Sequence, residues 1–150
     1  EPSDIKEEYQ EKIKENIFKA LTVLGIQNGA SHTEFKLDEN GEFGIIEIGA
    51  RMGGDCIGSD LVQISTGYDF VKMVIDVACG KEPDFTKTTE PTKVNIKFIF
   101  TKQDLDEMNK YKKEHPQKIY RISDMELENL GKTVDSSTRI GYYIYTPEKY

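Results

Sequence analysis

The segment HTEFKLDENGEFGIIEIGAR, residues 32–51, limits the possible folds of this chain more than any other segment. Asn40-Gly41 is the strongest short-range signal for a β-hairpin, and apolar residues alternate with polar residues on both sides of it. We therefore expect strands over about 30–37 and 43–50, joined by a two-residue type I′ turn.

The predicted turn determines which residues face each other across the hairpin. Counting outward from it gives the pairs Glu39–Glu42, Lys36–Ile45, Glu34–Glu47 and His32–Gly49. Because side chains alternate along a strand, one face carries His32, Glu34, Glu47, Gly49 and Arg51. The other face is mostly apolar and is expected to cover the core: Thr33, Phe35, Leu37, Ile46 and Ile48. A one-residue bulge in the turn would move Glu47 to the core face, so this apolar pattern supports the register.

Glu34 and Glu47 would lie directly opposite each other, with Cβ atoms roughly 4.5–5.5 Å apart, and like charges at that position are destabilising. Four interpretations are open. The two side chains are both solvated, or Arg51 lies between them as a structural ion pair. Alternatively they are the acid and nucleophile of a glycosidase, or they hold a divalent cation. Mg²⁺ usually takes one or two carboxylates together with substrate phosphates, so the pair suits this ion.

Composition excludes several classes of protein. The 150 residues have a net charge of −7, which argues against a broad surface for nucleic acid or for anionic membranes. No apolar run is long enough to cross a bilayer, so we expect no membrane partner. The two cysteines, Cys56 and Cys79, have no metal-ligand spacing, and we expect reduced thiols in a cytoplasmic protein.

The remaining patterns predict an α+β fold with an antiparallel or mixed sheet and flanking helices. Apolar spacing from Ile5 to Leu24 predicts a helix that Ser3 caps and Gly25 ends. Two shorter helices should follow the hairpin, separated at Gly67 and ending at Gly80. Residues 81–92 form a polar connector, after which we expect strands over 93–101, 118–124 and 139–146 and a helix over 103–115.

Taken together, HTEFKL and GIIEIGARMGGD resemble the C-terminal half of an ATP-grasp domain, of the carboxylate–amine ligase and carbamoyl-phosphate-synthase-like type. In that family two acidic residues on neighbouring strands hold the Mg²⁺ ions that bridge ATP phosphates. The second acid usually begins a Glu-x-Asn-x-Arg pattern that glycines follow. Glu34 and Glu47 match the two acids and Arg51 matches the arginine. Gly49 stands where the family has Asn as a further metal ligand, and glycine has no side-chain oxygen to replace it.

The resemblance implies an ATP-dependent ligase that joins a small carboxylate to an amine through an acyl phosphate. Mg²⁺ or Mn²⁺ would be held by Glu34 and Glu47, and ATP would be a substrate. Arg51 would contact the transferred phosphoryl group or the acyl oxyanion, although a salt bridge to Glu47 is the structural alternative. Two other functions stay open: a carbamoyl-phosphate-synthase-like enzyme that uses bicarbonate, and a non-catalytic regulatory module with a degenerate ATP-grasp fold.

Further substrate-binding candidates lie beside these residues: His32, Gly53, Gly54, Asp55 and Ser59. The glycines would let the backbone approach a substrate closely. Ser59 is also a candidate helix cap, and His32 could equally be a satisfied histidine of the sheet. Cys56 is expected to be a small loop residue rather than a nucleophile, because no partner base is evident.

The resemblance also implies a domain organisation. Residues 1–84 would be the C-terminal half of the ATP-grasp domain with its metal-binding hairpin, and 85–150 would complete the same lobe. The family's upstream lobe, with its phosphate-binding lysines and flexible lid, has no counterpart in the sequence. We therefore expect part of a longer enzyme, inactive without that N-terminal lobe and possible as an oligomer.

Overall fold

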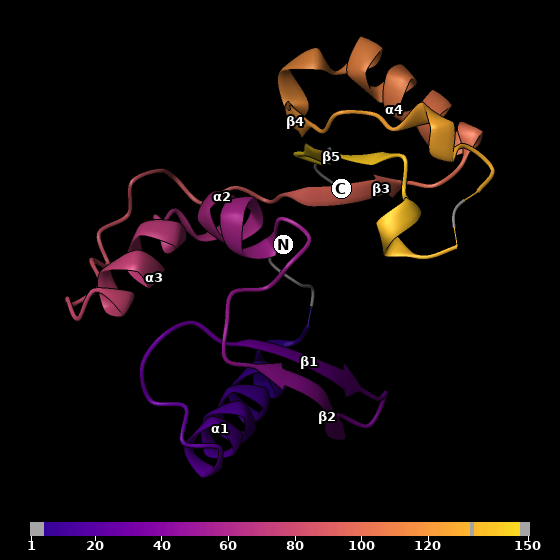
Figure 1. Ribbon diagram of the computed structural model, residues 1–150. Coiled ribbons are helices and arrows are strands. Elements are labelled where there is room, and N and C mark those ends of the chain that lie inside the picture. Colours follow the sequence, from indigo (N-terminus) through magenta and orange to yellow (C-terminus); the bar gives the residue numbers. More distant parts are fainter. Residues whose placement is uncertain (1–4, 133, 148–150) are drawn as a thin grey trace. The chain divides into compact units, whose positions relative to one another are not determined.

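A computed structural model describes residues 5–132 and 134–147. It divides into two compact units, Pro2–Pro91 and Thr92–Tyr150 (Figure 1). The first unit contains a two-stranded antiparallel sheet with helices, and the second contains a three-stranded antiparallel sheet with a helix. The predicted α+β class is confirmed.

The first unit begins with helix α1, Glu7–Val23, as the apolar spacing predicted. The predicted cap, Ser3, lies outside the described residues. Gly25 adopts the left-handed conformation expected at a helix end, with φ +71°. The helix lies along the hairpin (Figure 1), where Lys12 Nζ donates to the Gly41 carbonyl oxygen at 3.1 Å. Gly41 is buried under the Tyr9 ring, where a Cβ atom would clash with that ring.

Strands β1, His32–Leu37, and β2, Phe43–Gly49, form the predicted hairpin, but its turn is different. The Asp38 N–H donates to the Glu42 carbonyl and the Gly41 N–H donates to the Asp38 carbonyl. This pattern leaves a three-residue loop of residues 39–41 with glycine in the left-handed conformation, φ +78°. The Asp38 side chain stabilises the loop, because its Oδ1 accepts from the backbone N–H groups of Asn40 and Glu42 at 2.9 and 2.7 Å. The predicted type I′ turn was wrong for this reason.

A second irregularity restores the predicted register farther along the hairpin. Phe35 pairs with Ile45, whereas the preceding residue Glu34 pairs with Glu47, so Ile46 is an extra residue in β2. The extra residue of the turn and the extra residue of β2 cancel. Consequently the pairs Glu34–Glu47 and His32–Gly49 are confirmed, and the pair Lys36–Ile45 is wrong.

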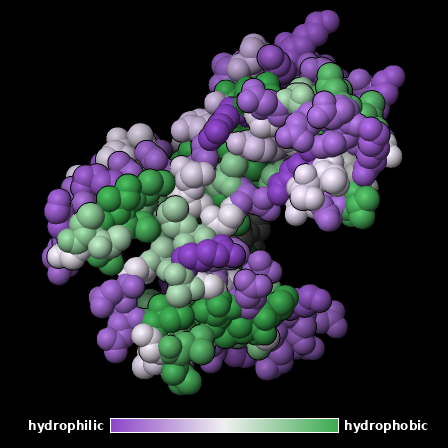
Figure 2. Space-filling model, viewed as in Figure 1, coloured by the Kyte–Doolittle hydropathy of each residue, from purple (hydrophilic) through white to green (hydrophobic). Residues whose placement is uncertain are grey.

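The bulge also changes which side chains are covered. Ile46 was predicted on the core face but is 58% exposed. The Phe35 and Phe43 rings meet on that side of the sheet, 5.0 Å apart. Phe18 in α1 and Leu24 just after it are also exposed. Figure 2 shows an apolar surface over α1 and the hairpin.

A π-helix, η1, Ile57–Leu61, leads into helix α2, Val62–Thr66. Gly67 ends α2 with φ +83°, and a Cβ atom there would collide with the Thr89 carbonyl oxygen. Helix α3, Phe70–Ala78, starts at Asp69, whose side chain accepts from the Lys72 N–H at 3.0 Å. The two helices and their separation at Gly67 are as predicted, whereas the π-helix was not predicted.

The second unit contains strands β3, β4 and β5 in the order β3-β5-β4. Their bounds are Asn95–Ile99, Ile119–Ile122 and Gly141–Tyr145. Helix α4, Lys102–Glu114, packs on one face of the sheet (Figure 1). The buried core of this face is formed by Ile99, Met108, Ile140 and Tyr143. A capping box formed by Thr101 and Asp104 starts α4. Three single-turn 3-10 helices complete the described residues: Pro116–Lys118 (η2), Leu127–Asn129 (η3) and Ser136–Thr138 (η4).

Candidate active site

The site is centred on Glu34 and Glu47, which face each other across the hairpin as predicted. Both residues are exposed. Within residues 5–132 and 134–147, neither carboxylate forms a hydrogen bond or an ion pair with another side chain. Two carboxylates at paired positions of neighbouring strands, without a cationic side chain beside them, are a suitable pair of ligands for a hard divalent cation.

The donor set is small. The described residues contain no group of three or more histidine, cysteine or carboxylate side chains that could hold a metal ion. Mg²⁺ in proteins typically has one or two carboxylates, and water and substrate phosphate oxygens complete its coordination. The pair therefore fits Mg²⁺ that arrives with a phosphate-bearing substrate, and it does not fit a cation held by protein ligands alone.

Arg51 lies beyond the end of β2 and folds back over Gly49. An atom at the Cβ position of residue 49 would be 3.5 Å from Arg51 Cγ and 3.9 Å from Cζ. One guanidinium nitrogen donates to the Met52 carbonyl oxygen at 2.8 Å. Arg51 forms no ion pair with Glu34 or Glu47 in the described part of the chain. The guanidinium is exposed, and its other donors can face an anion.

His32 pairs with Gly49, one register step beyond the two acids. Its ring packs against Gly53, where a Cβ atom would lie 2.9 Å from His32 Cδ2 and 3.0 Å from Ile57 Cγ2. A Cβ atom 2.9 Å from His32 Cδ2 would be closer than real contacts allow, so only glycine fits at residue 53 without displacing the His32 ring. Gly54 differs, because a Cβ atom there would have nothing within 4 Å.

The loop after Gly54 is conformationally unusual. Asp55 and Cys56 both adopt positive φ, +50° and +63°, which few residues other than glycine do. The loop closes through two hydrogen bonds, from the Ile57 N–H to the Gly54 carbonyl at 2.8 Å and from the Gly58 N–H to the Gly53 carbonyl at 3.3 Å. These bonds hold Gly53 and Ile57 together beside His32.

Ser59 lies inside the π-helix and is exposed, so it does not cap a helix there. Its hydroxyl donates to Asp60 Oδ2 at 2.6 Å. Asp60 is only 8% exposed, and sequence reasoning did not select it. The sequence signal that could have identified Asp60 is an acidic residue among apolar residues with helical spacing. Cys56 is half-buried and Cys79 is exposed, and both are free thiols.

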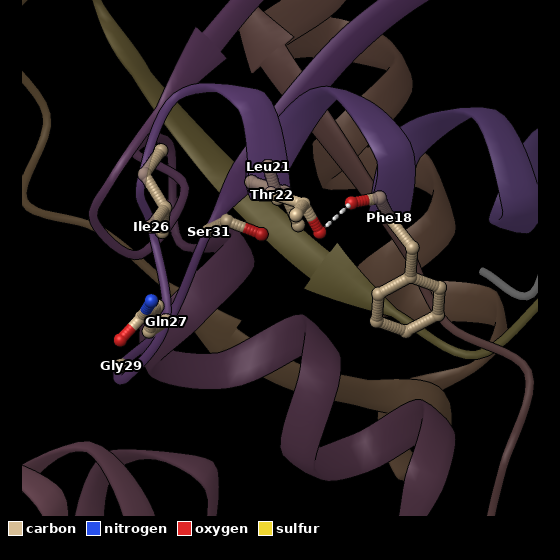
Figure 3. A pocket seen from close by; sticks show the side chains of 7 residues that line it. All are labelled: Phe18, Leu21, Thr22, Ile26, Gln27, Gly29 and Ser31. Carbon is tan, nitrogen blue, oxygen red and sulfur yellow. Dashed lines mark hydrogen bonds between the residues drawn. The ribbon is translucent and has the colours of Figure 1, made fainter.

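A separate pocket of about 510 Å³ lies at the C-terminal end of α1 (Figure 3). Its lining consists of Phe18, Leu21, Thr22, Ile26, Gln27, Gly29 and Ser31. The Thr22 hydroxyl donates to the Phe18 carbonyl oxygen at 2.8 Å. Among the described residues that line this pocket, none is charged and none is a predicted site residue, so this lining is not suited to phosphate groups. No described helix has the length and apolar character needed to cross a membrane.

The sequence model of the ATP-grasp domain matches residues 1–60. This segment contains α1, the hairpin and the loop of residues 50–56 that joins β2 to η1, which we call the glycine loop. Residues 1–60 are thus similar to part of an ATP-grasp domain. The resemblance predicted from the hairpin is therefore confirmed, and both acids and Arg51 lie inside the matched ATP-grasp segment.

Alanine–anticapsin ligases are among the relatives that this chain resembles. That of Bacillus subtilis strain 168 is 42% identical over 84 residues, which are 55% of this chain and 18% of the relative. That of Bacillus amyloliquefaciens is 38% identical over 87 residues, 57% of this chain and 18% of the relative. The chain therefore spans about a fifth of the length of these relatives.

Two solved structures of similar fold cover almost the whole chain. L-amino acid ligase from Bacillus licheniformis matches with a TM-score of 0.71 and 26% identity, over 99% of this chain and 38% of that one. Phosphoribosylglycinamide synthetase from Anaerococcus prevotii matches with a TM-score of 0.76 and 25% identity, over 99% of this chain and 39% of that one. The similarity of fold thus extends past the ATP-grasp segment into the second unit.

Proposed function

We propose that this chain supplies the metal-binding part of an ATP-dependent ligase that joins an amino acid to an amine. The observation that carries the proposal is the opposed pair Glu34–Glu47 on the hairpin of an ATP-grasp segment. The names of the relatives, alanine–anticapsin ligase and L-amino acid ligase, favour an amino acid over bicarbonate as the carboxylate substrate. The finer assignment, an acyl-phosphate intermediate, is part of the proposal.

Each residue of the site has a role in this proposal. Glu34 and Glu47 hold Mg²⁺ or Mn²⁺, which when bound neutralises charge on the ATP phosphates. Arg51 contacts the transferred phosphoryl group or the acyl oxyanion with its exposed nitrogens. Gly54 and Asp55 lie on the exposed side of the glycine loop, where a substrate can approach the backbone. Ser59 would contact the substrate from the first turn of the π-helix.

The remainder of the enzyme is also part of the proposal. The pair Glu34–Glu47 lies on an open, exposed hairpin, and phosphoryl transfer requires a site that positions both substrates and excludes water. We infer that an upstream lobe closes over the hairpin and that the chain is inactive alone. That the second unit completes the same lobe, and that the protein is cytoplasmic, stay predictions.

The experiment is ADP formation by the full-length protein with Mg²⁺ and a pool of L-amino acids. The proposal predicts that the pool stimulates ADP release and that Glu47→Gln abolishes the stimulation. Glu39→Gln is the matched control, since Glu39 is an exposed acid in the turn of the same hairpin. Equal stimulation in wild type and Glu47→Gln would show that the pair does not serve ATP chemistry.

A non-catalytic module is the second candidate, and Gly49 is the observation that favours it. Glycine contributes no ligand at that position, and no third protein ligand replaces it within the described residues. Such a module would bind Mn²⁺ and ATP through the acid pair without releasing ADP in the presence of any amino acid. The same assay therefore separates the two candidates.

A further inference from the structure

The π-helix η1 carries Ser59 next to the segment that ends the hairpin. The backbone of Gly58 packs directly on Met52, since a Cβ atom at residue 58 would lie 2.6 Å from Met52 Cβ. The Met52 carbonyl oxygen in turn accepts from the Arg51 guanidinium at 2.8 Å. Ser59 follows Gly58 at the distance of one residue, about 3.8 Å between Cα atoms, and it is exposed. A small substrate molecule at Arg51 is therefore within reach of the Ser59 hydroxyl.

Asp60 determines which hydrogen bonds the Ser59 hydroxyl can form. In the part of the chain that the structure describes, Asp60 is the one charged residue that is buried. Its Oδ2 accepts from the Ser59 hydroxyl at 2.6 Å. A carboxylate has acceptors and no donor, so the proton of this hydrogen bond belongs to the hydroxyl. The lone pairs of Ser59 Oγ are then what the hydroxyl offers to a ligand.

This arrangement restricts the chemistry of the ligand. A hydroxyl whose proton is already donated can only accept, so it pairs with an N–H group and not with a carboxylate or phosphate oxygen. The charge of the Asp60 carboxylate acts in the same direction, because it attracts an ammonium group and repels an anion. The pair Ser59–Asp60 therefore suits the amino group of a substrate and rejects its carboxylate.

We propose that Ser59 binds the amino group of an amino-acid substrate and that Asp60 is the positioning residue that keeps the Ser59 hydroxyl in its accepting orientation. The inference rests on the proposed ligase function and deepens it, because it separates the subsite for the amino group from the cation and Arg51, which serve the anionic groups. The amino group belongs to the amino acid that is activated or to the amine that attacks it, and the experiment distinguishes these two sources.

A purely structural role for the Ser59 hydroxyl is the alternative. The backbone of η1 is held without it, since the N–H groups of Asp60 and Leu61 both donate to the Cys56 carbonyl oxygen, at 3.0 and 2.9 Å. π-helical turns are rare and occur frequently at functional sites. Because Ser59 is exposed and its hydroxyl bonds only to the neighbouring side chain, we expect Ser59→Ala to fold.

The experiment measures ADP release by the full-length protein as the concentration of the L-amino-acid pool is varied. Ser59→Ala should raise the half-saturating concentration of the pool by about tenfold or more, while that of ATP stays within about twofold of wild type. Ser59→Thr keeps a hydroxyl and should restore the value for the pool. Ser65→Ala is the matched control, because the Ser65 hydroxyl donates to the Val62 carbonyl oxygen of its own helix, α2, at 3.3 Å.

Excess hydroxylamine separates the two sources of the amino group. It replaces the attacking amine and traps an acyl phosphate as a hydroxamate, so the pool then supplies only the carboxylate substrate. A higher half-saturating concentration of the pool in Ser59→Ala with hydroxylamine assigns Ser59 to the amino group of the activated amino acid. An increase that occurs only without hydroxylamine assigns Ser59 to the attacking amine.

Asp60→Asn tests the positioning role. An amide can donate to Ser59 Oγ and thereby release the hydroxyl proton. Asp60→Asn should therefore raise the half-saturating concentration of the pool when Ser59 is present and add nothing further in the Ser59→Ala background. Independent, multiplying effects of the two substitutions would overturn the positioning role.

An unchanged half-saturating concentration of the pool in Ser59→Ala, or an equal increase for the pool and for ATP, would overturn the inference. The rise in melting temperature that the pool causes without ATP reports binding independently of catalysis, and Ser59→Ala should abolish this rise. Wild type that shows the rise but releases no ADP would refute the ligase function and leave the amino-group site supported. Wild type that shows neither would overturn both.

Discussion

Gly53→Ala tests whether the glycine loop positions His32. A Cβ atom at residue 53 would lie 2.9 Å from His32 Cδ2 and 3.0 Å from Ile57 Cγ2, so both side chains must shift. Overpacking of this kind costs about 1–3 kcal/mol. Loss of glycine's freedom in the unfolded chain offsets about 0.4–1 kcal/mol of that cost. Gly54→Ala is the matched control, since the offset applies there and no atom lies within 4 Å.

We therefore expect Gly53→Ala to unfold with a free energy about 1–3 kcal/mol below that of Gly54→Ala. Urea denaturation measures this difference as a shift of the midpoint at constant m-value. In the His32→Ala background the destabilisation by Gly53→Ala should be smaller, because the His32 ring is the closer of the two side chains that the added Cβ atom would meet. The two mutations should therefore show a coupling energy of about 0.5–3 kcal/mol. Equal stabilities of the two glycine variants, or a Gly53→Ala cost that is the same with and without the ring, would refute the proposed packing.

Three further predictions concern stability. Gly67→Ala should destabilise the protein by about 1–3 kcal/mol more than Gly25→Ala. Both glycines have positive φ, but only at residue 67 would an added Cβ atom meet a backbone carbonyl oxygen. The urea midpoints of the two variants measure the difference. Thr33→Val should leave the unfolding free energy unchanged or raise it by up to about 1–2 kcal/mol. The reason is that the buried Thr33 hydroxyl has no hydrogen-bond partner in the described part of the chain. A lower melting temperature of the variant in thermal unfolding would contradict this. Burial alone would raise the pKa of Asp104, but hydrogen bonds from the Thr101 side chain and neighbouring backbone N–H groups outweigh it and lower that pKa. The Asp104 contribution to stability should therefore be complete above about pH 4 and lost at lower pH, so Asp104→Asn should reduce the acid dependence of unfolding, and an unchanged pH profile would exclude the effect.

The acid pair was predicted correctly although the turn was not, because the extra residue of β2 compensates for the extra residue of the turn. The turn residues Asn40-Gly41 located the hairpin, and the apolar alternation favoured a register with Glu34 opposite Glu47. The register near the turn could not be predicted, because the Asp38 side chain and the contact of Gly41 with α1 select a three-residue loop. Tertiary packing of that kind is not visible in local sequence.

The features of the glycine loop were beyond sequence reasoning for a related reason. Nothing in the sequence indicates that Asp55 and Cys56 take positive φ, a conformation that their residue types rarely adopt. Gly53 was predicted to make room for a substrate, and in the structure the atoms beside it are those of His32 and Ile57. The helices and strands, in contrast, followed the sequence closely, because periodicity and capping residues determine them locally.

The most direct test of the central claim, that Glu34 and Glu47 hold a divalent cation together with ATP phosphates, is a Mn²⁺ titration of the full-length protein. Electron paramagnetic resonance of free Mn²⁺ reports binding with and without ATP, in wild type, Glu47→Gln and Glu39→Gln. We predict that ATP strengthens Mn²⁺ binding in wild type and in Glu39→Gln and that this gain is lost in Glu47→Gln. The same ATP-dependent Mn²⁺ binding in all three proteins would contradict the account.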